Sequence, residues 1–552
     1  MNLKIFKTVV FFAALSFSFT VSGQNCSREI PPDIFTIDGD EMEIQPGETV
    51  CLLAGEKDFL LIKNVHGTAS HPVTFINKEG AVIINTEHYF GIKMANDSYV
   101  KLLGNGRQGI DYGIQVQRVA NGAGISVGEM STDIEIAFVE VANTAIAGVY
   151  AKTDPSCDNF EATRGKFTMR NFWLHHCYVH NTADEGLYIG SSKYTGQYLP
   201  DCDTTVLPHV IEGVKIFNNI VENTGWDGIQ VSSATVNCSV HDNRIKFDSQ
   251  AEYPGQMSGI LLGGGSKCKT YNNTISDGKG DGIDVFGLGN HDIFNNLIVR
   301  AGQTYNPGNP NDFKHGIYVG NVVTEQGALL GLYNNTIVEP KSFGVTLAND
   351  DMSRIFVLNN IITAPGQLPV AGNQAYINVN TSSGVEAQNN FLKPSNAQVK
   401  FVDDVNGNFD LQPSSAAVNF GQDLTSQGVI FDILNRSRPF HTFFDAGAFE
   451  SHDPHANIGE TGELSNKIAV YPIPFCDNLT VKISDQNVLK AGVIFVELID
   501  ITGKTVMSSK KIVPLRGEYM FTLKTGKIDA GCYILKLNTG DDVKRVIVLK
   551  KQ

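Results

Sequence analysis

A repeated pair of polar residues between residues 215 and 392 constrains the fold of this chain most strongly. Each pair lies between short apolar stretches and is usually Asn-Asn, as in FNNIVEN, YNNTISD and LNNIITA. The pairs are Asn218/Asn219, Asp242/Asn243, Asn272/Asn273, Asn295/Asn296, Asn334/Asn335, Asn359/Asn360 and Asn389/Asn390, and they recur every 23 to 39 residues. A repeat of this length is too short to bury a core alone, so the sequence predicts a solenoid of stacked units.

Asparagine suits this position for two physical reasons. It tolerates the left-handed backbone of a tight turn, and its amide can bond to nearby backbone. Stacked amides can also bond to one another from one unit to the next. The repeat therefore predicts an internal Asn ladder with a structural role.

A second motif runs in step with the first and consists of a glycine followed by alternating apolar residues. Such alternation is typical of short strands with one buried face. Each unit therefore contains at least two strands separated by turns. The motif occurs as AGVY from Ala147, EGLYI from Glu185, DGIQV from Asp227, SGILL from Ser258, DGIDV from Asp281, HGIYV from His315 and FGVTL from Phe343.

The two motifs together resemble those of the right-handed parallel β-helix proteins, a large family that includes pectate lyases and polygalacturonases. The resemblance covers roughly residues 50–450. It implies an all-β fold, a right-handed single-stranded parallel β-helix of about 11–13 coils. It implies little about function, since unrelated activities share this scaffold.

The N-terminus has the features of an exported protein. Residues 1–23 combine a basic start, an apolar run and small residues at Val21-Ser22-Gly23, which indicates a cleaved signal peptide. Residues 24–65 are expected to cap the first coil, because an open solenoid end exposes unpaired strand edges. The β-helix is expected over residues 66–450. No later stretch is apolar enough to span a bilayer.

The polar composition of residues 451–466 indicates a linker, and the sequence after it has a different residue pattern. Residues 467–552 resemble the C-terminal sorting domain of the bacterial type IX secretion system. The matched features are Tyr471-Pro472-x-Pro474-Phe475, Asp500-x-x-Gly503-Lys504 and Gly531-x-Tyr533. The resemblance implies a small β-sandwich, the secretion machinery as a partner, and a secreted or outer-membrane surface location.

Charge and cysteine content narrow the possible partners. The formal charge of −15 argues against nucleic acid, whose phosphates require a basic surface. Export permits disulfides, and nine cysteines leave at least one unpaired.

Position along the chain suggests which cysteines meet. Cys26 and Cys51 could clip the cap, and Cys157 and Cys202 lie in neighbouring insertions. Cys238 and Cys268 each precede their Asn pair by four residues, so they should lie on adjacent coils, as a disulfide or a reduced stack. Cys476 and Cys532 lie in the last domain. Cys177 aligns with Asn219 and is expected to be buried and unpaired.

A groove is expected beside the glycine-led strands. Insertions at 151–170, 191–210, 247–256 and 301–313 would wall it, the last two carrying Tyr253 and Tyr305. By alternation, the outward residues are Tyr150, Tyr188, Gln230, Leu261, Asp284, Tyr318 and Thr346. Tyrosines among hydrogen-bonding groups suit sugar rings, although Tyr is also favoured on any strand.

The residues before each glycine form another row, which includes Glu185, Asp227, Asp281 and His315. Asp227 and Asp281 should lie two coils apart, roughly 9.6 Å between Cα atoms, near the carboxyl separation of inverting glycosidases. Glu185 and Asp227 lie one coil apart, near the retaining distance. The structural alternative is that Asp-Gly simply forms turns, with these side chains on the inward parity.

The catalytic residues of polygalacturonases and of polysaccharide lyases cannot be assigned directly to positions in this sequence. Polygalacturonase motifs are out of order here: Asn181-Thr182 is followed by Ala183, and Arg244-Ile245-Lys246 precedes Lys314-His315-Gly316. A polysaccharide lyase would need a base, which His315, Lys314 or Tyr318 could supply. It would also need a group that neutralises the substrate carboxylate, such as a calcium ion held by Asp277, Asp281 and Asp284.

The sequence therefore predicts a secreted or cell-surface protein that binds and cleaves an extracellular polysaccharide, as a glycoside hydrolase or a lyase. A non-catalytic glycan-binding or adhesin-like solenoid is the alternative.

Overall fold

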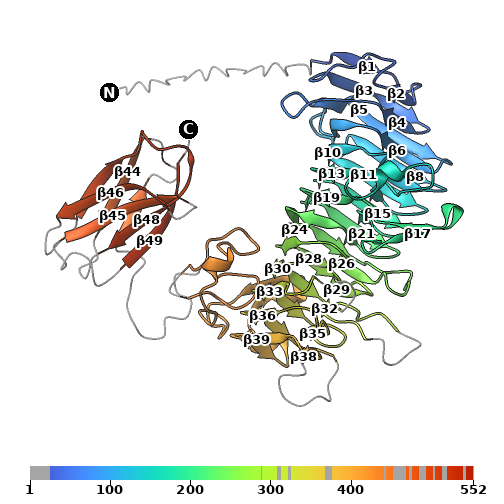
Figure 1. Ribbon diagram of the computed structural model, residues 1–552. Coiled ribbons are helices and arrows are strands. Elements are labelled where there is room, and N and C mark those ends of the chain that lie inside the picture. The colour runs from blue at the N-terminus through green and yellow to red at the C-terminus, as the bar shows by residue number, and fades with distance from the viewer. Residues whose placement is uncertain are drawn as a thin grey trace, which may run out of the picture. The chain divides into compact units, whose positions relative to one another are not determined.

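The regular structure of the chain is almost entirely β-strand (Figure 1). The computed structural model describes residues 25–287, 289–306, 313–320, 325–366, 376–440, 443–451, 468–471, 475, 477–483, 493–500, 504–512, 519–538 and 543–550. The expected signal peptide, nearly all of the linker and Cys476 lie outside these residues. The chain divides into a first unit, Met1–Cys268 with Asp277–Gly289 and Val322–Thr324, and a second unit, Lys269–Ser276, Asn290–Asn321 and Glu325–Gln552.

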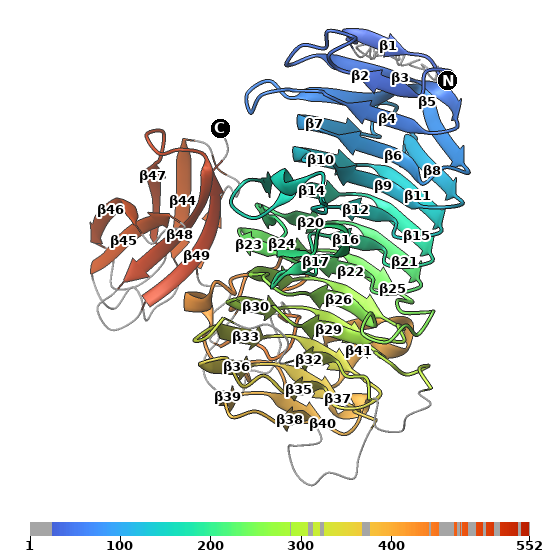
Figure 2. The same ribbon diagram turned by 45° about the vertical axis from the view of Figure 1, so that its right-hand side comes forward.

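The glycine-led strands pair in parallel and form what we call the Gly-strand sheet (Figure 2). Within the described residues it has twelve strands, in agreement with the predicted 11–13 coils. The strands of the first unit are β2 (Thr36–Asp38), β4 (Leu60–Lys63), β6 (Phe90–Ala95), β9 (Ala123–Gly128), β12 (Val149–Ala151), β16 (Leu187–Ile189), β22 (Ile229–Val231), β26 (Ser258–Leu262) and β29 (Asp281–Val285). Those of the second unit are β32 (Ile317–Val319), β35 (Val345–Leu347) and β38 (Ile377–Val379).

Close packing between coils requires the motif glycine at several positions, among them Gly148 and Gly186. A Cβ atom on Gly148 would lie 2.3 Å from the Val179 side chain and 2.7 Å from the Gly186 carbonyl oxygen. Gly186 has the same relation to Val221 on the following coil, at 2.5 Å. Any larger residue would push successive coils apart, which explains why glycine recurs at this position.

The other two strands of each coil meet at a corner, which contains the Asn pair from β20 and β21 onward. In the first unit the strands before the corner are β7 (Ser98–Leu103), β10 (Thr132–Ala137), β14 (Trp173–His175), β20 (Lys215–Phe217) and β24 (Cys238–His241). The strands after it are β8 (Ile114–Val119), β11 (Val139–Thr144), β15 (Tyr178–Thr182), β21 (Ile220–Thr224) and β25 (Arg244–Lys246).

The second unit repeats this arrangement. Before the corner lie β27 (Cys268–Tyr271), β30 (His291–Phe294), β33 (Leu329–Tyr333), β36 (Arg354–Leu358) and β39 (Gly384–Gln388). After it lie β28 (Thr274–Ser276), β31 (Leu297–Val299), β34 (Thr336–Val338), β37 (Ile361–Thr363) and β40 (Phe391–Lys393).

The predicted Asn ladder is confirmed in both units. The first residue of every pair has a left-handed backbone, with φ between 49° and 59°. The second points inward: Asn219 Nδ2 donates to Asn243 Oδ1 at 3.0 Å in the first unit. In the second unit Asn296 Nδ2 donates to Asn335 Oδ1 at 3.0 Å, and Asn335 Nδ2 to Asn360 Oδ1 at 3.0 Å. Each amide thus satisfies buried polar groups that the turn would otherwise leave unpaired.

The first described strands of this sheet belong to the same stack. Strands β1 (Arg28–Ile30), β3 (Thr49–Lys57) and β5 (Val73–Thr86) pair in parallel. Smaller elements of the first unit are η1 (Phe160–Ala162), η2 (Pro200–Cys202), β13 (Thr168–Arg170), β19 (Val210–Glu212), β23 (Ala234–Val236), β17 (Gln197–Leu199) and β18 (Thr204–Val206).

The disulfide predictions are confirmed as far as the described residues reach. Disulfides join Cys26 to Cys51, Cys157 to Cys202, and Cys238 to Cys268. The stacked pair on adjacent coils is therefore a disulfide, with Cα atoms 4.5 Å apart. Cys177 is buried and unpaired, as expected from its place in the Asn row.

In the second unit, residues 396–451 lie along the corner. They include η4 (Asn396–Gln398), β41 (Phe401–Asp403), η5 (Asp404–Asn406), β42 (Asn408–Leu411) and η6 (Thr425–Gln427). The outer Asn of several pairs bonds to this segment: Asn295 Nδ2 donates to the Phe431 carbonyl at 2.6 Å and Asn334 Nδ2 to that of Asp445 at 2.8 Å. The outer amides thus fasten the segment while the inner amides form the ladder.

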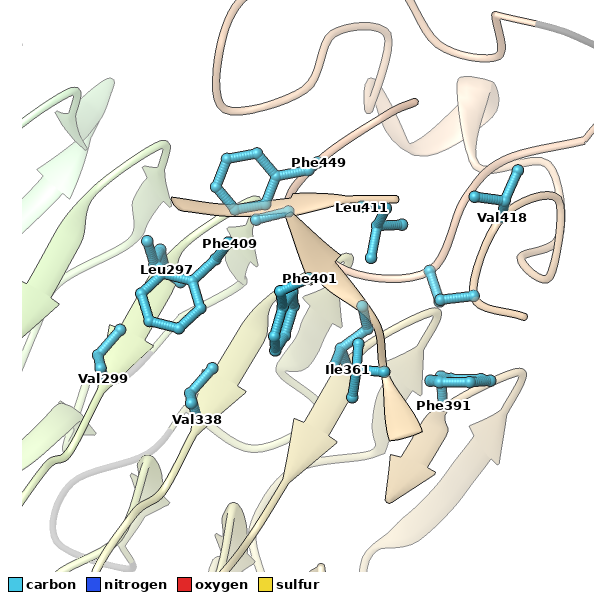
Figure 3. Close-up of a cluster of buried hydrophobic side chains, with 14 residues drawn as sticks. Leu297, Val299, Val338, Ile361, Phe391, Phe401, Phe409, Leu411, Val418 and Phe449 are labelled. Atoms are coloured by element: carbon cyan, nitrogen blue, oxygen red, sulfur yellow. The ribbon is translucent and has the colours of Figure 1, made fainter. Parts of the chain in front are cut away.

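Apolar side chains complete this attachment. Phe401 and Phe409 pack over the strands that carry Leu297, Val338 and Ile361 (Figure 3). All five side chains are buried, so the outer face of β31, β34 and β37 is part of a second hydrophobic core.

The C-terminal residues form two antiparallel sheets, consistent with the predicted small β-sandwich. One contains β43 (Ile468–Tyr471), β44 (Asn478–Ile483) and β47 (Tyr519–Lys524). The other contains β45 (Val493–Asp500), β46 (Thr505–Ile512), β48 (Gly531–Asn538) and β49 (Val543–Lys550). Side chains of both sheets, among them Leu479, Val496 and Leu535, bury one shared core.

Candidate functional site

The predicted outward row exists on the Gly-strand sheet. In the first unit Tyr150, Tyr188, Gln230, Leu261 and Asp284 occupy equivalent positions on successive strands. In the second unit Tyr318 is level with Thr346. The row is exposed unevenly: the two tyrosines of the first unit are half-buried, whereas Gln230 is only 1% and Asp284 only 6% exposed.

An insertion packs against the loop at the end of β26. The ring of Tyr194, from the insertion after β16, lies against Gly265, where a Cβ atom would be 2.0 Å from the ring. The Arg164 guanidinium, from the insertion after β12, lies 3.9 Å from the centre of the same Tyr194 ring. The Cys157–Cys202 disulfide joins the same two insertions. Both walls are therefore held together, and one reaches past β22 toward the loop after β26.

Lys152 lies next to the two half-buried tyrosines of this face, and its own side chain is 9% exposed. Its Nζ atom is 4.9 Å from the centre of the Tyr150 ring and 4.7 Å from that of Tyr188. The two rings meet edge to face at 5.1 Å. Lys152 also forms an ion pair with Asp154 at 3.0 Å, and Tyr150 donates a 3.4 Å hydrogen bond to the same carboxylate. This arrangement fixes a cation between two aromatic rings, a favourable position for a partly desolvated ammonium group.

The charge state of this cluster follows from its surroundings. Burial lowers the pKa of Lys152, but Tyr188, Tyr150 and Asp154 outweigh burial, so its pKa lies above the ordinary value. Burial raises the pKa of Tyr150 to about 12. At neutral pH, Lys152 is therefore a cation and Tyr150 a neutral hydrogen-bond donor.

Neither Lys152 nor Asp154 was among the residues predicted from the sequence. Their signal is the continued alternation Tyr150-x-Lys152-x-Asp154, which keeps all three on the outward parity. The predicted outward row contained one residue from each strand and did not extend into the insertion after β12.

The predicted carboxylate row is buried in the first unit. Glu185, Asp227, Ser258 and Asp281 are all at most 4% exposed. Ser258 Oγ donates a 2.7 Å hydrogen bond to Asp227 Oδ1, while Asp227 Oδ2 and Glu185 Oε1 are buried without a hydrogen-bond partner among the described residues. Register confirms that Asp227 and Asp281 are two coils apart, with Ser258 between them.

Burial controls the titration of these carboxyl groups. It raises the pKa of Glu185 to about 7, with a further contribution from Asp184. It raises the pKa of Asp227 well above the ordinary range, and the nearby Glu185 adds to this. Asp248, which was not predicted, has a pKa raised by burial to about 6. Glu185 can therefore give or accept a proton near neutral pH, whereas burial favours the neutral form of Asp227.

The remaining predicted residues occupy different settings. Tyr253 is 50% exposed and stacks on Trp226, with ring centres 4.4 Å apart. In the second unit, His315 is nearly buried, stacks on Tyr318 at 5.8 Å and lies 3.3 Å from Thr346 Oγ1 through Nδ1. Tyr305, also of the second unit, is buried, with Lys314 Nζ 5.7 Å from its ring centre.

The structure does not assemble the predicted calcium site. No group of three or more His, Cys, Asp or Glu side chains in the described part of the chain could hold a metal ion. Asp281 and Asp284 belong to one strand and are three residues apart, so they point to opposite faces of the sheet. Asp277 lies outside that strand, in a left-handed turn.

Comparisons with known proteins identify two segments. Residues 209–392 match the family described as the right handed beta helix region, and residues 469–549 match the secretion system C-terminal sorting domain. The chain thus contains a right-handed parallel β-helix and a sorting domain of the type IX secretion system. The protein is secreted or located at the outer-membrane surface. No helix among the described residues is long and apolar enough to cross a membrane.

Several solved structures are similar at low identity. Pectate lyase Pel9A is 11% identical with a TM-score of 0.40, over 78% of this chain and 97% of that one. An alginate lyase from Paenibacillus sp. is 13% identical with a TM-score of 0.37, over 55% and 98%. A mannuronan C-5 epimerase A-module from Azotobacter vinelandii is 14% identical with a TM-score of 0.35, over 63% and 90%. No curated protein matches the chain.

Proposed function

We propose that this protein binds and cleaves an extracellular polysaccharide on the outer face of the Gly-strand sheet, around Tyr150, Lys152 and Tyr188. The observation that carries the proposal is the cation held between two half-buried tyrosine rings beside Asp154. Ring faces and phenol hydroxyls suit sugar rings. A fixed ammonium group suits a sugar carboxylate. That carboxylate would compete for Lys152 with the Asp154 side chain, which is 42% exposed.

Lyase chemistry matches this set of groups better than hydrolysis. A lyase removes the proton next to a uronate carboxylate, which requires a neutralising cation and a base. Lys152 provides the cation without a metal. Glu185, whose pKa of about 7 is lowered by Lys152 and raised chiefly by burial, is the base that we favour.

One observation favours the non-catalytic alternative. Asp227 is fully buried and Glu185 is 2% exposed, so neither carboxyl group reaches the surface without some opening of the walls. A glycan-binding solenoid would need only the tyrosines and Lys152.

A product assay distinguishes these functions. The protein is incubated with polygalacturonate, alginate and neutral xylan, with and without a chelator. A lyase gives ultraviolet-absorbing unsaturated products from an acidic chain, in the presence of chelator as well. A hydrolase gives reducing ends without that absorbance. Binding without any product would establish the non-catalytic function and contradict the proposed cleavage.

A further inference from the structure

A cavity of about 420 Å³ lies in the first unit at the corner of the coils, away from the Gly-strand sheet. We call it the corner pocket. The loop between β7 and β8 forms one side, and the corner positions of three later coils form the other. Its lining includes Arg107, Gln108, Asp111 and Tyr112 of the loop, and Phe138 and His176 of the corners.

The loop of the corner pocket is fixed at both ends. Asn77 is fully buried, and its Oδ1 atom accepts a 2.8 Å hydrogen bond from the Gly106 N–H. A Cβ atom on Gly106 would lie 1.8 Å from the Asn77 carbonyl oxygen, and one on Gly113 would lie 2.2 Å from the Asn77 amide nitrogen. Such close contacts hold the loop in place over the corner. The cavity is therefore preformed, as binding sites for small ligands usually are.

The floor of the pocket is aromatic. Phe138 and His176 occupy corresponding left-handed corner positions, with φ of 58° and 54°. Their rings stack at a centre-to-centre distance of 5.0 Å. Tyr112 on the loop is half-buried, with its ring 6.1 Å from that of Tyr178. Where later coils place asparagine at this corner, these coils place rings, and a ring face is a surface on which a sugar can stack.

The rim of the pocket is polar and balanced in charge. Arg107 contributes one positive charge and Asp111 one negative charge, and burial lowers the pKa of His176, which favours its neutral form. No described residue forms a hydrogen bond with the side chains of Arg107, Gln108 or Asp111, so their donors and acceptors are available to a ligand. Paired donors and acceptors suit hydroxyl groups, each of which both donates and accepts.

We propose that the corner pocket is a second saccharide-binding site, which takes one or two neutral sugar residues of a glycan chain. Its volume falls within the usual range of ligand pockets, roughly 300–1,000 Å³. Its balanced charge favours a neutral sugar over a uronate, in contrast to the face around Lys152. The two sites lie on different sheets of one unit, so the corner pocket could hold a glycan that the Gly-strand face does not cleave.

The test is binding of the full-length protein to an array of neutral and acidic oligosaccharides, followed by titration calorimetry with the neutral glycan bound most strongly. Tyr112→Ala and Arg107→Ala should each weaken that binding at least tenfold. Arg107 is exposed, so its variant should fold normally even if Tyr112→Ala does not. Tyr89→Ala is the matched control, because Tyr89 is 80% exposed and does not line the pocket.

A third variant separates the two sites. Lys152→Met should leave binding at the corner pocket unchanged, whatever it does to cleavage. Three results would overturn the inference: no neutral glycan binds, binding survives in both pocket variants, or only acidic glycans bind. Loss of binding in Lys152→Met alone would assign the glycan to the Gly-strand face instead.

Discussion

The ammonium nitrogen of Lys152 lies 4.7 Å from the centre of the Tyr188 ring, which belongs to the next strand of the Gly-strand sheet. Lys152 is at the start of the insertion after β12, and Tyr188 is on β16, the strand that precedes the next insertion. The solenoid sets the separation of the two coils, and the insertions set how much of the pair is exposed. The proposed site thus depends on both the repeat and its interruptions.

Tyr188→Ala should weaken polysaccharide binding more than it lowers turnover, because the ring offers contact area to the sugar but moves no proton. We expect KM or Kd to rise about tenfold, with kcat changed by less than about threefold. Tyr188→Phe, which loses only the hydroxyl bonded to Ser192 at 2.9 Å, should retain most of the affinity. Equal loss of affinity in both variants would show that the hydroxyl, rather than the ring, contacts the sugar.

Stability should depend on pH through Glu185. Burial raises its pKa from 4.5 in the unfolded chain to about 7 in the folded protein, so the neutral form is favoured and stability is lost as pH rises from about 4.5 through about 7. Each pKa unit corresponds to about 1.4 kcal/mol. The free energy of unfolding of the Glu185→Gln variant should therefore exceed that of the wild type by up to about 3 kcal/mol at pH 8.5, and by almost nothing at pH 4.

Melting temperatures at the two pH values measure this difference. Glu161→Gln is the control, since the Glu161 side chain is 68% exposed. A Glu185→Gln advantage that is the same at both pH values would mean that packing, not ionisation, is responsible.

Asn335→Ala should destabilise the β-helix by about 1–3 kcal/mol, because it leaves the buried Asn296 amide and the Ile293 carbonyl without their partner. Asn389→Ala is the matched control from the outer positions: its amide donates one exposed 3.1 Å hydrogen bond to Phe420. Thermal or denaturant unfolding measures both. Similar small losses in the two variants would contradict a structural role for the inner ladder.

Removal of the Cys157–Cys202 disulfide should affect the site more than removal of Cys26–Cys51. Each disulfide closes a loop of tens of residues, and each double Cys→Ser variant should lose about 2–4 kcal/mol of stability. Only the first joins the two insertions beside Lys152. We expect KM to rise severalfold in that variant alone, measured at a temperature where both are folded. Equal KM values would show that the walls do not depend on the disulfide.

Features that repeat with the coil could be predicted from the sequence. The period places Asn219 beside Asn243 and Cys238 beside Cys268, because residues at equal positions in successive coils must stack. The covering of Gln230 could not be predicted in this way. No repeat encodes the path of a single insertion, such as the one that brings Tyr194 against Gly265.

Parity also has limits as a guide to a site. Alternation along the strand correctly predicted that Tyr150 and Tyr188 point outward, and it put the Asp227 side chain on the inward side. It cannot report which outward residues another segment covers. The use of the outer Asn295 and Asn334 amides to fasten residues 396–451 was missed for a related reason: the Asn pairs carry no sign of a partner about a hundred residues later.

The most direct test of the proposed site is the turnover of Lys152→Met on a polysaccharide that the wild type degrades. We predict that kcat/KM falls at least about 10²-fold, since the fixed cation that stabilises developing negative charge is lost. Lys152→Arg should keep part of the activity, and Lys101→Met, whose lysine pairs with Glu135 on another sheet, should keep all of it. Full activity in a normally folded Lys152→Met variant would contradict the account.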